Sequence, residues 1–276
     1  SKSVKTRQCK LLVCDLNSYG VNVVLFGSFT TGTVAHWSRQ NTQNQTTPIL
    51  ENIQGLIDFQ SEDLDADGDP DLMIHSTDDH GLHWYQNLGD WNFEKREFQQ
   101  NSAITPHFFT TIDLDLDGNL DLLTNTTINA GQDNRISWHK NDGTPLALQT
   151  TILFDVPGIA GKPVAGDLDN DGDTDILISN NSGPARLYSN QIGSKQHWLG
   201  ITLQTAEKST PTLQCRIDVK LPDDRTLTRT PRTDGSYLST NDPRVLIGLG
   251  HLSDNVALRI YLSLIHISEP TRRYAI

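Results

Sequence analysis

Three nine-residue segments carry aspartate at alternating positions, so their side-chain oxygens could bind a metal ion. The segments are 63–71, 113–121 and 167–175, and each follows the pattern D-x-D-x-D-G-x-x-D. Side chains at positions 1, 3, 5 and 9 can converge on one point, a backbone carbonyl at position 7 can join them, and the glycine permits a sharp chain reversal. Hard oxygen ligands select a hard cation, so the pattern predicts Ca²⁺ binding, with about three sites.

We expect an equivalent ligand set in each of these Asp loops. The predicted side-chain ligands are Asp63, Asp65, Asp67 and Asp71 in the first loop, Asp113, Asp115, Asp117 and Asp121 in the second, and Asp167, Asp169, Asp171 and Asp175 in the third. The predicted carbonyl ligands belong to Asp69, Asn119 and Asp173. Two carboxylates about 4 Å apart repel by roughly 4 kcal/mol at an effective dielectric of about 20, so an empty loop should open or take up protons. Mg²⁺ is less expected, because it resists dehydration and prefers fewer protein ligands.

The acidity of the chain is concentrated in these loops. The 276 residues carry a net charge of −12, and the loops hold 14 aspartates, which leaves +2 for the remainder. Local acidity of this kind favours cation binding and argues against nucleic-acid or anionic-membrane partners, which need basic patches. The longest apolar run, near Val21–Phe26, is far shorter than the roughly 20 residues that span a bilayer, so no membrane insertion is expected.

An EF-hand begins with similar residues but requires a bidentate Glu at position 12 and a helix on each side. The three loops have Ile74, Thr124 and Ile178 at that position and continue into segments typical of short buried strands. The sequence therefore argues against an EF-hand.

The loops belong to a longer repeat, with spacings of 50 and 54 residues. Each copy continues through a strand-like segment to an aromatic turn: Trp84-Tyr85-Gln86-Asn87, Trp138-His139-Lys140-Asn141 and Leu187-Tyr188-Ser189-Asn190. A fourth, worn copy with Asp15, Asn17, Tyr19 and Gly20 starts 48 residues before the first loop, but Val23 replaces its last ligand, so we expect little or no Ca²⁺ binding there. A period near 50 with several short strands predicts four-stranded β-propeller blades, whereas a helical solenoid would place apolar residues at i, i+3 and i+4.

The pattern changes after Asn190. No further Asp loop follows, and five alternating segments predict a small β-domain: 197–204, 214–221, 225–232, 245–249 and 256–262. Pro222-Asp223-Asp224 is typical of a hairpin turn. The predicted fold class is all-β, a partial propeller of about three clear blades plus one worn blade followed by this domain. The predicted domains are residues 1–191, 192–262 and a tail at 263–276.

These residues resemble the FG-GAP and VCBS-type repeats of integrin α-chain propellers and bacterial surface proteins. All three loops match, and the resemblance implies cation sites that are commonly structural. The segment after Asn190 resembles the ASPIC/UnbV domain that follows such repeats in the cartilage acidic protein family. Its matching residues are His197-Trp198-Leu199-Gly200, Gly235-Ser236-Tyr237-Leu238-Ser239, Asp242-Pro243-Arg244 and Gly248-Leu249-Gly250. The linker 205–213 departs from the usual pattern.

The resemblance also implies about seven blades, so we expect this chain to be an N-terminally truncated fragment of a longer protein whose open propeller exposes a blade edge. The tail, with Leu264-Ile265-His266-Ile267-Ser268-Glu269-Pro270-Thr271-Arg272, resembles translated sequencing-adaptor read-through. We therefore exclude the tail from functional argument.

Other candidate chemistry is weaker. His75, His80 and His83 with Asp78 and Asp79 could bind a transition metal, but a polar turn between strands is the simpler interpretation. Trp37, Trp84 and Trp138 recur at equivalent places in the repeat, which favours packing between blades over a ligand-stacking surface. The three cysteines, Cys9, Cys14 and Cys215, predict neither a disulfide framework nor a zinc site.

The sequence predicts no enzymatic activity. It has no G-x-S-x-G, Walker, G-x-G-x-x-G or H-E-x-x-H motif, and a carboxylate bound to Ca²⁺ is held ionised, which makes it a poor general acid. The leading hypothesis is a Ca²⁺-binding scaffold for an extracellular protein or glycan, located outside the cell, in the periplasm or at the cell surface. The alternative is the accessory region of a secreted enzyme whose catalytic module lies upstream.

Overall fold

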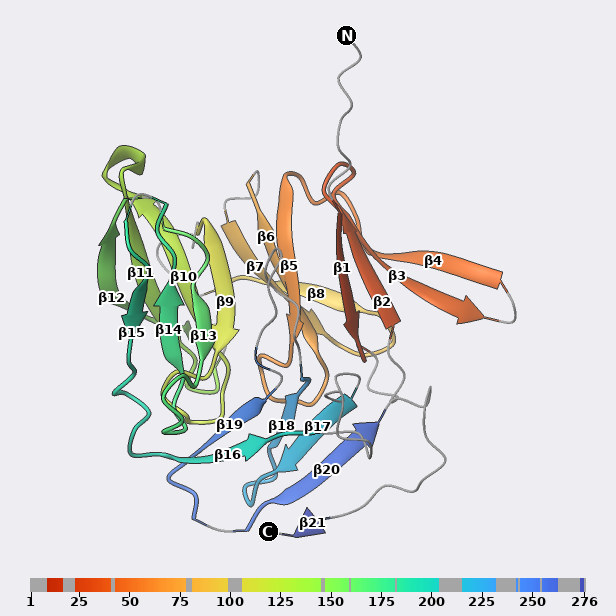
Figure 1. Cartoon of the computed structure of the whole chain (residues 1–276). Coiled ribbons are helices and arrows are strands. Elements are labelled where there is room, and N and C mark those ends of the chain that lie inside the picture. The colour runs from red at the N-terminus through yellow and green to blue at the C-terminus, as the bar shows by residue number, and fades with distance from the viewer. Residues whose placement is uncertain are drawn as a thin grey trace. The chain divides into compact units, whose positions relative to one another are not determined.

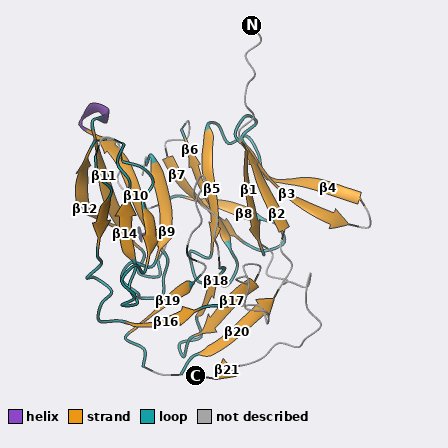
Figure 2. Cartoon of the chain, viewed as in Figure 1, coloured by secondary structure: helices purple, strands orange, loops and turns teal. Residues whose placement is uncertain are grey.

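The structure is a computed structural model of the chain. It describes residues 9–16, 23–40, 43–77, 81–98, 106–144, 147–158, 160–181, 183–203, 215–231, 242, 244–253, 255–262 and 274–275. β-strands dominate these residues (Figure 2), and a short 3₁₀ turn, η1 (Asn129–Gly131), connects two of them. No helix in the described part of the chain is long and apolar enough to cross a membrane.

The chain divides into two compact units. Unit 1 comprises Ser1–Glu62, Asp69–Thr105 and Leu262–Ile267, and unit 2 comprises Asp63–Gly68, Pro106–Tyr261 and Ser268–Ile276. The predicted domain boundaries at 191/192 and 262/263 stay predictions.

Unit 1 contains two four-stranded antiparallel sheets, in which neighbouring strands follow one another in sequence (Figure 1). The first sheet consists of β1 (Cys9–Cys14), β2 (Val23–Ser28), β3 (Thr33–Gln40) and β4 (Gln43–Leu50). The second consists of β5 (Leu56–Glu62), β6 (Asp71–Ser76), β7 (Gly81–Asn87) and β8 (Phe93–Arg96). One apolar core joins both sheets, with Leu25 and Val34 from the first and Phe59, Leu72 and Ile74 from the second. Each sheet thus buries a face against its neighbour, as propeller blades do.

Unit 2 contains two further sheets of the same kind. One is four-stranded, with β9 (Phe108–Ile112), β10 (Asp121–Ile128), β11 (Asp133–Lys140) and β12 (Gln149–Pro157). The other has β13 (Val164–Gly166), β14 (Asp175–Ile178) and β15 (Arg186–Tyr188). Their shared core includes Ile112, Leu123, Ile136, Ile176 and Ile178. The predicted all-β fold with propeller-type blades is therefore confirmed.

The blades differ from the prediction in one respect. The worn copy forms a four-stranded sheet, whereas the third Asp loop lies in a three-stranded sheet. In the other blades the fourth strand follows the aromatic turn directly, but after Tyr188 the chain leaves the sheet and enters β16 (His197–Ile201), which pairs with β19 (Val245–Gly250) instead.

The segment after Asn190 forms two small sheets, the pair β16–β19 and the sheet β18-β17-β20-β21. The remaining strands are β17 (Cys215–Lys220), β18 (Thr226–Arg229), β20 (Ala257–Leu262) and β21 (Tyr274–Ala275). β16 to β20 match the five predicted segments, and the predicted turn closes with Leu221 N donating to the Arg225 carbonyl at 2.9 Å. Linker 205–213, motif 235–239 and tail residues 263–273 and 276 lie outside the described residues.

An asparagine at the end of each aromatic turn connects its blade to the preceding loop. Asn87 Nδ2 donates to the Leu16 carbonyl at 2.8 Å, Asn141 Nδ2 to that of Leu64 at 2.9 Å, and Asn190 Nδ2 to that of Leu114 at 2.8 Å. All three asparagines are buried. The repeated bond shows that the worn copy keeps the blade geometry.

Replacing Asn87 by Ala should lower the free energy of unfolding by about 2 to 3 kcal/mol, because buried carbonyls at Leu16 and Pro70 lose their donor. Urea unfolding followed by tryptophan fluorescence measures the change. The control is Asn92→Ala at an exposed position of the same unit, which should stay within about 0.5 kcal/mol of wild type. Equal losses in both variants would contradict a role for the inter-blade bond.

Candidate metal centre

The Asp loops occupy the same place in three sheets. They connect β5 to β6, β9 to β10 and β13 to β14, so each follows the first strand of its sheet. The fourth residue of each loop has a left-handed backbone, with φ of 57° at Ala66, 55° at Leu116 and 63° at Asn170. The glycines at position 6, Gly68, Gly118 and Gly172, have φ of 100°, 94° and 93°. One backbone path is thus repeated three times, and such positive φ values concentrate at functional sites.

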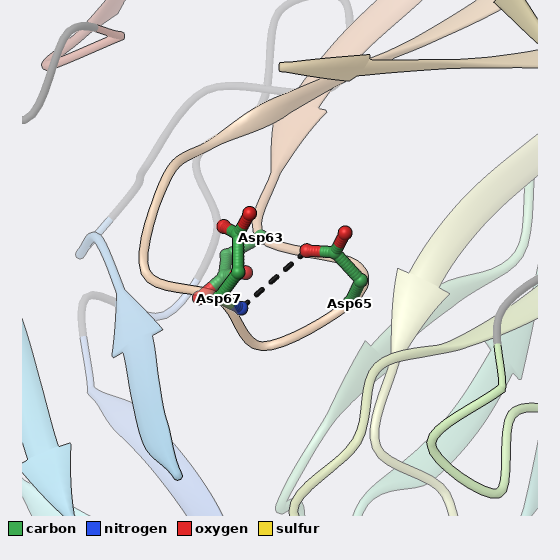
Figure 3. Close-up of side chains that lie close together, drawn as sticks. All are labelled: Asp63, Asp65 and Asp67. Carbon is green, nitrogen blue, oxygen red and sulfur yellow. Dashed lines mark hydrogen bonds between the residues drawn. The ribbon is translucent and has the colours of Figure 1, made fainter. Parts of the chain in front are cut away.

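Each loop brings its first three aspartates together. The groups are Asp63, Asp65 and Asp67, then Asp113, Asp115 and Asp117, then Asp167, Asp169 and Asp171, and one carboxylate oxygen from each member lies within 4.8 Å of the others. Figure 3 shows the first group, where the Asp67 amide donates to Asp65 Oδ1 at 3.4 Å. Two oxygens that share one Ca²⁺ at about 2.4 Å can be no more than about 4.8 Å apart. The three groups therefore could each hold a metal ion.

The first aspartate of each loop carries a buried, unpartnered oxygen. Oδ1 of Asp63, Asp113 and Asp167 has no hydrogen-bond partner among the described residues. The second oxygen of Asp113 instead accepts the amides of Gly118 at 3.0 Å and Gly248 at 3.1 Å. A buried carboxylate oxygen without a partner is costly when it is ionised, and a cation held at this loop position would remove that cost. The residues present therefore fit a divalent ion.

The ninth aspartate of each loop organises the backbone. Oδ1 of Asp71, Asp121 and Asp175 accepts the amide of the turn asparagine at 2.8, 2.8 and 2.9 Å. Asp121 Oδ2 also accepts from Leu114 N and Trp138 Nε1, at 3.1 and 2.8 Å. These residues are not in the groups of three, although a carboxylate oxygen with two lone pairs can also bind an ion. Ligation by the ninth aspartates stays a prediction, whereas their hydrogen bonds are a structural role that sequence reasoning missed.

The seventh residues, predicted to contribute carbonyls, differ in their side chains. Asn119 Nδ2 donates to Asp117 Oδ1 at 3.0 Å, whereas both carboxylate oxygens of Asp173 are buried and have no hydrogen-bond partner in the described part of the chain. Asp69, the equivalent residue of the first loop, is partly buried. The Asp173 side chain could therefore offer a further oxygen ligand, a role for which the pattern had indicated only its carbonyl.

The second loop already contains a cationic group. The Lys140 ammonium forms ion pairs with Asp115 and, at 3.0 Å, with Asp117. Gln86 and Ser189 occupy the equivalent turn positions, so the lysine distinguishes this loop from the other two. An ion in the second loop would share these carboxylates with Lys140.

Burial and mutual repulsion raise the pKa of several loop carboxyls. Burial is the largest cause of the rise in the pKa of Asp63, which reaches about 7. Arg229 opposes this rise, and repulsion from Asp67 and Asp65 adds to it. Burial likewise raises the pKa of Asp113 to about 6, with Arg229 again opposing. Proton uptake by these carboxyls is the response expected of an empty cation loop.

The remaining candidates add little to the site. Asp15 of the worn copy is buried and Val23 lies in β2, whereas Asn17, Tyr19 and Gly20 lie outside the described residues. In the histidine cluster, His75 is buried in β6 and His83 lies in β7, but Asp78, Asp79 and His80 lie outside the described residues. Trp84 is buried, Trp138 packs against the core of unit 2, and Trp37 is 37% exposed.

In a comparison with known protein families, residues 63–124 and the overlapping residues 113–178 each match the FG-GAP-like repeat. The matched region, residues 63–178, contains all three Asp loops. No curated protein sequence matches the chain.

Two solved structures show limited similarity. One, a lectin of Agrocybe aegerita described as recognising non-reducing terminal N-acetylglucosamine, is 16% identical with a TM-score of 0.44 over 75% of this chain and 60% of that chain. The other, BBS1N in complex with ARL6DN and soaked with lead, is 12% identical with a TM-score of 0.41 over 95% of this chain and 82% of that chain. Neither similarity bears on what this chain binds.

The chain stripped of divalent cations should be less stable at about pH 8 than at about pH 5. The folded-state pKa values of Asp63 and Asp113, about 7 and about 6, lie above the ordinary value of 3.8. The stability contributed by these two raised pKa values is therefore fully present below the unfolded-state pKa. It is lost as the pH rises through the folded-state pKa values. Urea midpoints measure the slope, and the double variant Asp63→Asn/Asp113→Asn should reduce it. A stripped wild type that gains stability toward pH 8 would contradict the prediction.

Proposed function

We propose that this chain is a Ca²⁺-binding, non-enzymatic scaffold in which each Asp loop holds one ion that stabilises its own blade. The observation that carries the proposal is the buried, unpartnered Oδ1 of the first aspartate in all three loops. The FG-GAP-like repeats support it, because the loops occupy one equivalent place in each repeat.

Calcium fits these loops better than the alternatives. The groups consist of carboxylate oxygens, and neither a histidine nor a cysteine is a member, which favours a hard cation over zinc or copper. Ca²⁺ accepts six to eight oxygens in flexible geometry, whereas Mg²⁺ requires a stricter octahedron and retains water. The predicted carbonyl and water ligands would complete a Ca²⁺ shell.

The proposed role of the ion is structural. Each loop joins two antiparallel strands of one sheet. In the first and second loops, a turn asparagine from the following repeat also donates to the leucine carbonyl beside the first aspartate. Neutralising the loop carboxylates would therefore hold the strand ends together and preserve the inter-blade bond. Carboxylates that bind Ca²⁺ are held ionised and are therefore poor general acids, which supports a non-enzymatic role.

The proposed location is extracellular, periplasmic or at the cell surface. Extracellular Ca²⁺ modules use sites with dissociation constants of about 10⁻⁴ to 10⁻³ M, and loops as exposed as the third one fit this range better than a high-affinity buffer. The partner class we propose is an extracellular protein or glycan, which the fold alone does not decide.

Calcium should raise the melting temperature of the chain relative to chelator. Each site occupied at about 100 times its dissociation constant contributes about 2.7 kcal/mol, which corresponds to roughly 5 to 10 °C for a domain of this size. Calorimetry with Ca²⁺, Mg²⁺ and chelator measures the effect, and Mg²⁺ should give the smaller shift. An unchanged midpoint with calcium would overturn the structural role.

The double variant Asp115→Ala/Asp117→Ala should lose one of three Ca²⁺-binding events in isothermal titration calorimetry. The lost event should be weaker than that of the third loop, because Lys140 competes for these two carboxylates. The matched variant Asp169→Ala/Asp171→Ala should remove a stronger event from the third loop and leave the second intact. Loss of all three events in either variant would contradict one ion per loop.

A further inference from the structure

The glycine at position 6 of every Asp loop is covered by the β-strands that follow Asn190. A Cβ built on Gly172 would lie 1.8 Å from the Trp198 ring, and one on Gly118 would lie 2.9 Å from Leu227. A Cβ on Gly68 would lie 3.5 Å from the Arg216 guanidinium. At Gly118 and Gly172 the absence of a side chain therefore permits a close approach, whereas Gly68 lies at ordinary contact distance. All of these contacts lie within unit 2.

Hydrogen bonds accompany this coverage. Arg229 donates to the Gly118 carbonyl at 2.8 Å, and Gly250 N donates to the Leu116 carbonyl at 2.8 Å. At the third loop, Arg244 donates to the Asp167 carbonyl at 2.9 Å and to Asn170 Oδ1 at 2.8 Å. The loop backbone itself is the main acceptor, so these contacts depend on the loop conformation.

Asp113 belongs to both the cation site and this interface. Its Oδ1 is the buried oxygen without a partner, and its Oδ2 accepts the amide of Gly248 at 3.1 Å. Gly248 has no room for a side chain, because a Cβ there would lie 2.3 Å from the Leu116 carbonyl carbon and 2.4 Å from Asp113 Oδ2. One carboxylate therefore lies between the expected ion and β19.

Charge also matches across this interface. Arg229 is buried, and its guanidinium acts on both Asp63 and Asp113. One divalent ion in the first loop would still leave its five aspartates with a net charge of −3, so the arginine remains attracted to a loaded loop. Without an ion, repulsion between the carboxylates opposes the loop conformation that β18 and β19 contact.

We propose that β16, β17, β18 and β19 form a recognition face for the cation-loaded Asp loops, so that Ca²⁺ binding and docking of this face stabilise each other. This inference rests on the proposed function, because it requires the loops to bind Ca²⁺. Linkage is reciprocal: an ion that favours the docked loop must itself bind more tightly when the face is docked.

The test uses the full chain, with Ca²⁺ itself as the probe. Hydrogen exchange with and without Ca²⁺ should show backbone amides of β17, β18 and β19 protected about 5- to 150-fold more with the ion. Amides of β2 and β3, whose sheet has no intact Asp loop, serve as the internal control and should change little.

Two variants separate docking from binding. Gly248→Ala should displace β19 from the second loop and weaken its Ca²⁺ affinity about 5- to 150-fold in titration calorimetry. Its matched control is Gly183→Ala, where φ is not positive and a Cβ would come no closer than 3.5 Å to its neighbours. If Gly248→Ala does not fold, Trp198→Ala tests the same coupling at the third loop without changing charge, because Trp198 covers Gly172. Its control is Trp37→Ala, a similarly exposed tryptophan in β3, whose sheet has no intact Asp loop.

The outcomes distinguish the two proposals. Suppose that Ca²⁺ binds tightly, but that hydrogen exchange in β17 to β19 and the Ca²⁺ affinity of the foldable interface variant are both unchanged. That result would overturn the recognition face and leave the proposed function intact. No Ca²⁺ binding by wild type would overturn both. Calcium-dependent protection together with weaker binding in the interface variant alone supports the coupling.

Discussion

Repulsion between carboxylates held close together is the constraint on which much of this structure depends. Three loops each place three aspartates with oxygens within 4.8 Å of one another, and the first of the three directs an oxygen into a buried position. The chain offsets this repulsion in several ways. Backbone amides donate to Asp113, a lysine pairs with the second loop, and two arginines distant in sequence donate to the loop backbones. A divalent ion would complete this compensation, because it contributes two charges at the point where the carboxylates converge.

The sequence predicted what depends on local pattern. The loop spacing located the repeats, and alternating apolar residues located strands such as β17 and β19, which place Ile217, Val219 and Ile247 in one apolar core. The hairpin at Pro222 followed from turn chemistry. The sheet that carries the third Asp loop was predicted less well, because it has three strands instead of four. Whether a fourth strand forms depends on the path of the chain after Tyr188 and not on any residue within the repeat.

Within the site, the sequence indicated which residues gather but not what each oxygen does. The ninth aspartates satisfy the same spacing as the others, yet Asp121 is occupied by three hydrogen-bond donors. The contacts of Arg229 and Gly248 with the second loop span 111 and 135 residues, and no local pattern in either segment indicates a partner so far away. The sequence places Lys140 in a repeated turn, but it does not show that the lysine pairs with Asp115 and Asp117 of the loop.

The bond from each turn asparagine to the preceding loop also bears on how the protein is made. Its two ends are 71, 77 and 76 residues apart in the three instances. On the ribosome, the leucine carbonyl of one loop therefore has no asparagine to accept from until the next blade has been synthesised. Each newly made blade then completes the one before it, so maturation proceeds from the N-terminus with a delay of one repeat. A blade produced alone, or followed by a foreign sequence, would retain a buried carbonyl without its natural donor.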